Sequence, residues 1–277
     1  MTNEILIKDV LLEWNINSTL FYLISLATSI YIIGSFRLIK KSNSSILFNS
    51  FIRGLIGYLV LFLALIGPFG TFEETFWIHM VQHLLIIMIV PPLLLSGLFF
   101  SANLWFLPRV IRLGLADFVR PTSYFRKLLS KVTSPKFGMV FYIFCIWTWH
   151  LPIFFNYALD LDFVHVLEHI SFMVSGILFW WPIMGLNIGA KKLSLPIRIV
   201  YLLIAVTPTV VVAALITLAD GILYGENSPR LFGIDALLDQ RIGGLIMWIP
   251  GNTVFLITLT ILFFKWSYNQ NERKYKD

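Results

Sequence analysis

Long apolar segments recur along this chain of 277 residues, and each is long enough to cross a lipid bilayer as a helix. A bilayer core about 30 Å thick needs roughly 20 apolar residues in a helix. Of the residues, 58% are hydrophobic and only 13% are charged, whereas a soluble domain carries about 25% charged residues. A soluble fold of this length could not bury so many apolar side chains. We therefore expect an integral membrane protein whose surplus apolar surface faces lipid.

The apolar segments predict an all-α integral membrane protein with seven transmembrane helices, built as a single polytopic domain over 1–277. Helices are predicted rather than strands because the runs are long, and because backbone groups in lipid must bond within their own segment or within a closed barrel. The fourth segment is the least uniform, since Pro152 lies near its end. The predicted spans lie near 19–38, 51–69, 77–99, 137–154, 164–186, 197–219 and 243–264.

Basic residues are distributed very unevenly over the two sides that seven spans create. One side receives 18 of the 21 lysines and arginines, and the other receives only Lys8, Arg230 and Arg241. The basic side is expected to be cytoplasmic, which places the N-terminus outside and the C-terminus in the cytoplasm. Moving one span in or out of the count would scramble this asymmetry. Of the 15 acidic residues, 12 fall on the outer side, where they attract cations.

The net charge of +6 does not predict a nucleic-acid partner, because the basic residues lie in short segments between apolar runs. The longest predicted cytoplasmic connection, 100–136, contains apolar residues at helical spacing: Phe125, Leu128, Leu129 and Val132. Thr122 or Ser123, after Pro121, offers an N-cap. We expect an amphipathic helix on the anionic inner leaflet; a solvated loop with anchoring charges is the alternative.

All five histidines fall near the outer ends of the third, fourth and fifth predicted spans: His79, His83, His150, His165 and His169. Four of them form two i, i+4 pairs, so each pair lies on one helix face about 6 Å apart along the axis. Imidazole suits copper, zinc, iron and nickel, and polar groups inside a membrane are costly and therefore functional candidates. The pattern favours a metal site, whereas interfacial histidines bonded to carbonyls or water are the alternative.

Two other chemistries remain open from these residues. His165-Val-Leu-Glu168-His169 matches the H-x-x-E-H signature of a zinc protease, in which Glu168 would act as general base. A b haem held by His83 and His169 on facing helices is the other possibility, although no histidine is available near the inner side for a second haem. A retinal-type seven-helix pump needs a lysine in the middle of its last helix. That interpretation is excluded because Lys265 lies at the cytoplasmic end of the last predicted span.

Several ordered sequence blocks resemble one known family. They are His79-Met-Val-Gln-His83 followed by Pro91-Pro92-Leu, Trp149-His150-Leu-Pro152, His165-Val-Leu-Glu168-His169, Phe179-Trp180-Trp181-Pro182, and the block from Asp239-Gln240-Arg241 to Met247-Trp248-Ile-Pro250. Together they resemble the multi-span CtaG family of cytochrome c oxidase (caa-type) assembly factors over roughly 70–265. The resemblance implies a non-catalytic, multi-pass protein of the bacterial inner membrane that acts on subunits of a haem–copper oxidase. A copper-delivery role is a further implication.

These considerations combine into a hypothesis for the site. His79, His83, His165 and His169 are expected to form the core of an outer-leaflet copper site, because four imidazoles are a sufficient ligand set for copper. His150 is expected to be a fifth ligand or a hydrogen-bonding partner of the ligands. Glu168 and Asp239 are expected to accept from the imidazoles and so fix their tautomers. Met173, one turn beyond His169, is a candidate soft ligand at greater depth.

Gly243 and Gly244 open the last predicted span beside Asp239 and Gln240. Small residues let helix backbones approach closely. We therefore predict that this end of the span packs against the histidine-bearing helices. The alternative is a flexible entry to the span.

Overall fold

The computed structural model describes residues 13–42, 44–118, 120, 122–185, 192–225 and 231–274. Over these ranges the chain is helical with no strand, which confirms the all-α prediction for the part described. The elements are α2 Thr19–Ser42, α3 Ser45–Leu65, α4 Pro68–Thr71, α5 Phe76–Leu84, the π-helical η1 Leu85–Ile89, α6 Val90–Ser96, α7 Phe99–Phe106, α8 Arg109–Phe118, α9 Tyr124–Val132, α10 Pro135–Trp149, α11 Pro152–Asp160, α12 Asp162–Met184, α13 Leu195–Thr217, the short η2 Leu231–Gly233 and α14 Ala236–Lys274.

Six membrane-length helical segments are present among the described residues, and their number differs from the seven predicted. They are α2, α3 with α4, α5 through α6, α12, α13 and α14. A seventh span arises only if α10 and α11 count as one, although these two helices are bent by 73° relative to each other. Six apolar helices of this length fit a multi-pass membrane protein.

A break between α10 and α11 falls inside the single span predicted over 137–154, the least uniform of the seven in sequence. Proline disfavours the α conformation in the residue before it, and Leu151, which precedes Pro152, is extended with φ −74° and ψ 131°. Helix α10 therefore ends at Trp149 after 15 residues. At about 1.5 Å per residue this helix is shorter than a bilayer core about 30 Å thick.

The last helix is longer than the span predicted over 243–264. Helix α14 runs for 39 residues from Ala236 to Lys274. Its start precedes Gly243 because the Asp235 carboxylate accepts the Leu238 N–H at 2.8 Å and so caps the helix. The charged residues near 239–241, which resemble loop in the sequence, lie instead in the first turns of the helix.

The connection predicted over 100–136 holds three helices rather than one. Helix α7 packs against α2, where Gly34 lies so close to the Ala102 carbonyl that a Cβ at position 34 would overlap it. Helix α9 begins as predicted: the Ser123 hydroxyl accepts the Arg126 N–H at 3.0 Å. None of its residues is buried, and Phe125 and Leu128 are exposed. Attachment of α9 to a leaflet stays a prediction.

The third apolar segment is interrupted by η1 and by Pro91. A proline removes the hydrogen bond that its nitrogen would donate to the carbonyl four residues earlier, which here is the carbonyl of Ile87. The Trp180 indole N–H from α12 donates to that carbonyl at 3.1 Å. Neighbouring helices must satisfy such freed groups inside a membrane protein, so this bond joins α12 to the middle of the segment that carries His79 and His83.

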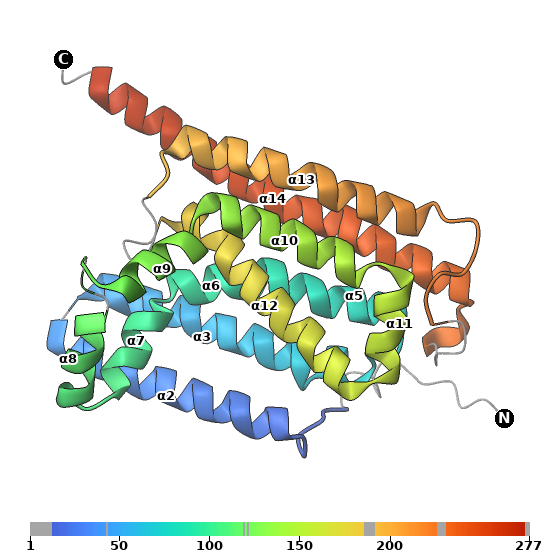
Figure 1. Ribbon diagram of the computed structural model, residues 1–277, viewed down its shortest axis with the longest axis horizontal. Helices are drawn as coiled ribbons and strands as arrows, with labels where there is room; N and C mark the ends of the chain where they lie inside the picture. The colour runs from blue at the N-terminus through green and yellow to red at the C-terminus, as the bar shows by residue number, and fades with distance from the viewer. Residues whose placement is uncertain are drawn as a thin grey trace.

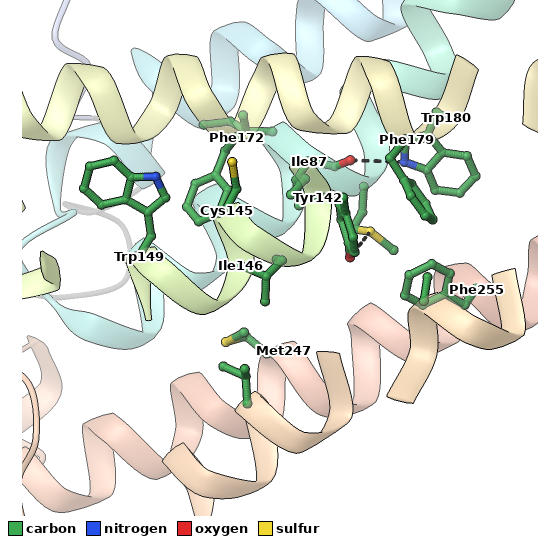
Figure 2. Packing of buried hydrophobic residues seen from close by; sticks show 14 of the residues in the cluster. Ile87, Tyr142, Cys145, Ile146, Trp149, Phe172, Phe179, Trp180, Met247 and Phe255 are labelled. Atoms are coloured by element: carbon green, nitrogen blue, oxygen red, sulfur yellow. Dashed lines mark hydrogen bonds between the residues drawn. The ribbon is translucent and has the colours of Figure 1, made fainter. Parts of the chain in front are cut away.

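The helices form an elongated bundle with two distinct ends. Helices α5 and α12 begin, and α10 ends, at the end that carries α11; we call this the histidine end (Figure 1). Helices α8 and α9 lie at the opposite end, as does the C-terminal part of α14 (Figure 1). The main core lies between α10, α12 and α14, where Tyr142 stacks on Phe179 at 4.3 Å between ring centroids (Figure 2).

The start of α14 packs against α5, as predicted for the two glycines. A Cβ at Gly243 would overlap the ring of Phe76 on α5. At Gly244 the neighbour is α13 instead, where a Cβ would overlap the hydroxyl oxygen of Thr217. The prediction is therefore confirmed for Gly243, while Gly244 serves contact between α13 and α14.

Candidate metal centre

Helix α5 carries the first histidine pair, and its N-terminus is held by α14. The backbone N–H groups of Phe76 and Trp77 donate to the two carboxylate oxygens of Asp239 at 3.1 and 2.9 Å. A carboxylate at a helix N-terminus accepts hydrogen bonds from N–H groups that have no partner within the helix. It also interacts favourably with the positive end of the helix dipole. The sequence predicted Asp239 as an acceptor for an imidazole; the structure places both of its oxygens on backbone N–H groups. Asp239 thus positions the helix that bears His79 and His83.

Helix α12 carries the second pair, with Glu168 facing α5. The Glu168 side chain is fully buried, and its carboxylate oxygens lie 3.5 Å from His79 Nε2 and 3.5 Å from His83 Nε2. The ring centroids of His79 and His83 are 4.2 Å apart, and those of His165 and His169 are 4.3 Å apart. The two pairs predicted from i, i+4 spacing therefore meet across the interface between α5 and α12.

Four of these residues can each offer one donor atom to a common point. Ligand atoms of His79, His83, Glu168 and His169 all lie within 4.8 Å of one another. The sequence predicted four imidazoles, whereas this group has three imidazoles and a carboxylate. Such closely spaced donors suit a single ion rather than a porphyrin between the rings.

A second group shares His169 and includes a residue that the sequence analysis missed. Ligand atoms of Glu73, His165 and His169 lie within 4.8 Å of one another, and Glu73 Oε1 is 3.5 Å from His165 Nδ1. The other Glu73 oxygen accepts from Gln82 at 2.9 Å. Burial raises the pKa of the Glu73 carboxyl, and the hydrogen bond from Gln82 opposes part of that rise. Its place in an acidic segment just before the first histidine pair was the available signal.

His150 lies beside the cluster but belongs to neither group. Its ring centroid is 6.1 Å from that of His83, and its Nδ1 donates to the Ile146 carbonyl at 2.7 Å. That bond leaves Nε2 with a lone pair, because a neutral imidazole carries one N–H. Met173, the predicted deeper ligand, is only partly buried and packs against the two hydrophobic clusters.

Unsatisfied donor atoms are concentrated at this site. Each unsatisfied buried polar atom costs about 1–3 kcal/mol, and native structures contain few of them. Buried atoms with no hydrogen-bond partner here are His79 Nε2, His83 Nδ1 and Nε2, His150 Nε2, His165 Nε2, His169 Nε2, and both carboxylate oxygens of Glu168. A bound cation would satisfy several of them at once, so the residues fit a metal ion.

The protonation pattern of His79 sharpens this argument. Its Nδ1 lies 3.0 Å from the Glu73 carbonyl oxygen and therefore donates to it. In the neutral ring, Nε2 then presents a lone pair to the Glu168 carboxylate at 3.5 Å. Two lone pairs facing each other repel, so the arrangement requires a proton or a metal cation at that point.

Comparison with known proteins connects this geometry to a family. Residues 29–269 match the model of the cytochrome c oxidase caa3 assembly factor family, Caa3_CtaG. The chain belongs to this family. The matched region includes every histidine of the cluster as well as Glu73, Glu168 and Asp239. The resemblance seen in the sequence blocks is thereby confirmed for Caa3_CtaG.

Relatives of this Caa3_CtaG member include uncharacterised mycobacterial proteins. The chain is 27% identical over 203 residues to ML1998 of Mycobacterium leprae and 29% identical over 203 residues to Mb0105 of Mycobacterium bovis. Each match covers 69% of this chain but only 30% of the relative, so the chain spans about a third of the length of these proteins. No solved structure matches the chain.

Proposed function

We propose that this protein assists the assembly of a haem–copper cytochrome c oxidase by binding a copper ion at the histidine cluster. Membership of the Caa3_CtaG family supports the assembly role. The observation that supports the metal is the set of buried imidazole nitrogens and carboxylate oxygens that have no hydrogen-bond partner. A scaffold that acted only through protein contacts would have no use for such atoms.

The donor chemistry favours copper over the other available ions. Imidazole and carboxylate sites bind divalent first-row metals with affinities that rise to a maximum at Cu²⁺. The proposed ligands are His79, His83, Glu168 and His169, whose donor atoms converge within 4.8 Å. One carboxylate also offsets part of the ion's charge in a buried site. His165 and Glu73 lie next to this set, where they would contact an ion on its way in or out.

The proposal also includes the orientation of the site. The uneven distribution of lysine and arginine favours a cytoplasmic location for the end with α8 and α9, so the histidine end would face outside. Acidic residues near that end, including Glu73 and Glu74, would attract cations there. Copper entering from outside would then meet the cluster without crossing the membrane.

The H-x-x-E-H protease geometry receives less support. A protease of that class holds zinc between its two histidines and keeps the glutamate as a base. Here Glu168 faces His79 and His83 of α5, and His165 pairs with Glu73. The carboxylate is therefore placed among the donor atoms rather than beside a reacting water.

The test is copper binding by the purified protein in detergent, measured by competition with a chelator. His83→Ala and His169→Ala are expected to abolish Cu²⁺ binding at the cluster while the protein remains folded, and His150→Ala is expected to weaken it less. Glu168→Gln, which keeps the side-chain volume, is expected to lower affinity by at least the roughly 10–100-fold that loss of a ligand's hydrogen-bond partner costs. The exposed Glu74→Gln serves as the matched control. Normal copper binding by the variants His83→Ala, His169→Ala and Glu168→Gln would refute the copper site.

Two further readouts separate the alternatives. Cells lacking the protein are expected to make oxidase polypeptides without oxidase activity, with other membrane enzymes spared. Normal oxidase activity in such cells, when no paralogue is present, would refute the assembly role. A Soret band in the absorption spectrum would indicate haem, and bound zinc with peptide cleavage would indicate an enzyme.

A further inference from the structure

A small cavity lies inside the bundle, directly beside the histidine cluster. Its volume is about 30 Å³, and its wall is formed by α5, η1, α10, α12, α13 and α14. His83 and His150 line it, as does the Gly251 backbone of α14. Most of the remaining wall is apolar: Figure 2 shows Ile146 of α10 and Met247 of α14, which both line the cavity.

Three methionine residues belong to the wall of this cavity. Three of the seven methionines of the chain line it, namely Met80, Met88 and Met247. They come from α5, η1 and α14 and are at most 7% exposed. The Tyr142 hydroxyl lies 3.7 Å from the Met88 sulfur, where it donates a hydrogen bond (Figure 2). No such bond is described for the sulfurs of Met80 and Met247.

The two imidazoles that line the cavity also carry ring nitrogens without partners. Both ring nitrogens of His83 and the Nε2 of His150 are buried with no hydrogen-bond partner. His150 is held by its Nδ1 bond to the Ile146 carbonyl, so its orientation is set independently of any ligand. The cavity wall therefore combines one imidazole of fixed orientation, that of His150, with flexible thioethers.

We propose that this cavity is a second metal site, specific for monovalent copper. Thioether and imidazole are the ligands that soft Cu(I) prefers. No aspartate or glutamate belongs to the cavity wall among the described residues. A divalent ion would bring two uncompensated charges into a medium of low dielectric constant, and the desolvation cost of an ion grows with the square of its charge.

The size of the cavity also favours an ion that binds without its water shell, as Cu(I) would here. A volume of 30 Å³ holds roughly two water molecules, since one water needs at least about 10–15 Å³ of such space. A hydrated cation does not fit, and the ion must exchange its water for protein donors. The site is therefore poorly suited to ions that keep their water shell, such as Mg²⁺.

His83 connects the two sites. Its Nε2 lies 3.5 Å from Glu168 in the histidine cluster, and its side chain also lines the cavity. An ion can pass from the carboxylate-containing cluster to the sulfur-lined cavity by moving around one imidazole, without a redox step if it arrives as Cu(I). This inference depends on the proposed function only for the route by which the ion arrives.

The test uses the full chain in detergent, titrated with Cu(I) under anaerobic conditions against a Cu(I)-specific chelator, and in parallel with Ag(I). The wild type is expected to bind two equivalents. His83 would ligate the ion of the cluster, and His150 Nε2 with the methionines would hold the ion of the cavity, because a neutral imidazole carries a lone pair on only one nitrogen. The double variant Met80→Leu/Met247→Leu is expected to lose one equivalent and retain the other. Replacing methionine by leucine changes side-chain volume little and usually costs less than about 1.5 kcal/mol, and Met139→Leu, a buried methionine outside the cavity wall, is the matched control.

Spectroscopy and a cluster variant separate this inference from the proposed function. X-ray absorption of the Cu(I) form is expected to show sulfur bound to copper in the wild type but not in the double variant. Two equivalents in the double variant, or an unchanged sulfur signal, would refute the cavity site and leave the histidine cluster standing. Conversely, His169→Ala is expected to lose only the equivalent bound by the cluster. If this variant kept both equivalents while the methionine variant lost one, the cluster would be refuted instead.

Discussion

The contact between Asp239 and the start of α5 offers the sharpest test of how the site is positioned. Asp239 is 3% exposed, and its two carboxylate oxygens each accept one backbone N–H, from Phe76 and Trp77. Asp239→Asn keeps the shape but leaves one acceptor oxygen. Its new NH₂ group would face the other backbone N–H, so one hydrogen bond is lost and a buried donor faces a donor.

The loss of stability expected for Asp239→Asn follows from these contacts. A hydrogen bond to a charged group contributes about 1.5–3 kcal/mol, and a carboxylate at a helix N-terminus contributes about 0.3–1 kcal/mol more. We therefore expect a loss of roughly 2–4 kcal/mol in the free energy of unfolding. At about 2–4 °C per kcal/mol for a chain of this size class, the unfolding midpoint in detergent is expected to fall by roughly 4–16 °C.

Asp235→Asn is the matched control for this experiment. Asp235 caps α14 itself and is exposed, with its Oδ1 accepting the Leu238 N–H at 2.8 Å. Asparagine is as good an N-cap as aspartate, so this variant is expected to unfold near the wild-type midpoint. Equal midpoints for Asp239→Asn and Asp235→Asn, measured by tryptophan fluorescence during heating, would refute the proposed role of Asp239 in holding α5.

Three further outcomes are expected. Gly243→Ala is expected to cost about 1–3 kcal/mol through overpacking against α5, visible as a lower unfolding midpoint, whereas Gly114→Ala, with no atom within 4 Å of the added Cβ, is not. Trp180→Phe leaves the Ile87 carbonyl without its donor and is expected to lower the free energy of unfolding by about 1–3 kcal/mol. Unfolding of this variant and of the wild type at the same urea concentration would contradict this role. A reporter fused to the C-terminus is expected to be active only in the cytoplasm, and one in the α13–α14 connection only outside; the reverse pattern would overturn the orientation.

The sequence was sufficient for the parts of this protein that depend on local pattern. Apolar segments of about 20 residues predict membrane helices because unpaired backbone groups are not tolerated in lipid. The i, i+4 spacing of His79 with His83, and of His165 with His169, places each pair on one face because a helix has 3.6 residues per turn. The Ser123 cap was likewise predictable, since it depends on residues within one turn.

The 73° bend between α10 and α11 has a local cause at Pro152, but hydropathy averages over such a break, so the sequence predicted one span there. Other features depended on contacts between segments far apart in the chain. Glu73 joins the site only because its segment folds back beside His165. The sulfur-lined cavity likewise needs Met80 and Met247, which lie on different helices.

Glu168 and Asp239 show the same division most clearly. Their identities marked them as acceptors, but spacing along a helix defines only which face a residue shares with its neighbours. Packing of α12 against α5 turned Glu168 toward both imidazoles, and packing of α14 placed Asp239 on the backbone of α5. Composition and periodicity thus determined which helices form and which polar groups they carry. Only the tertiary structure decided which of those groups meet, because that depends on the rotation of each helix against its neighbours.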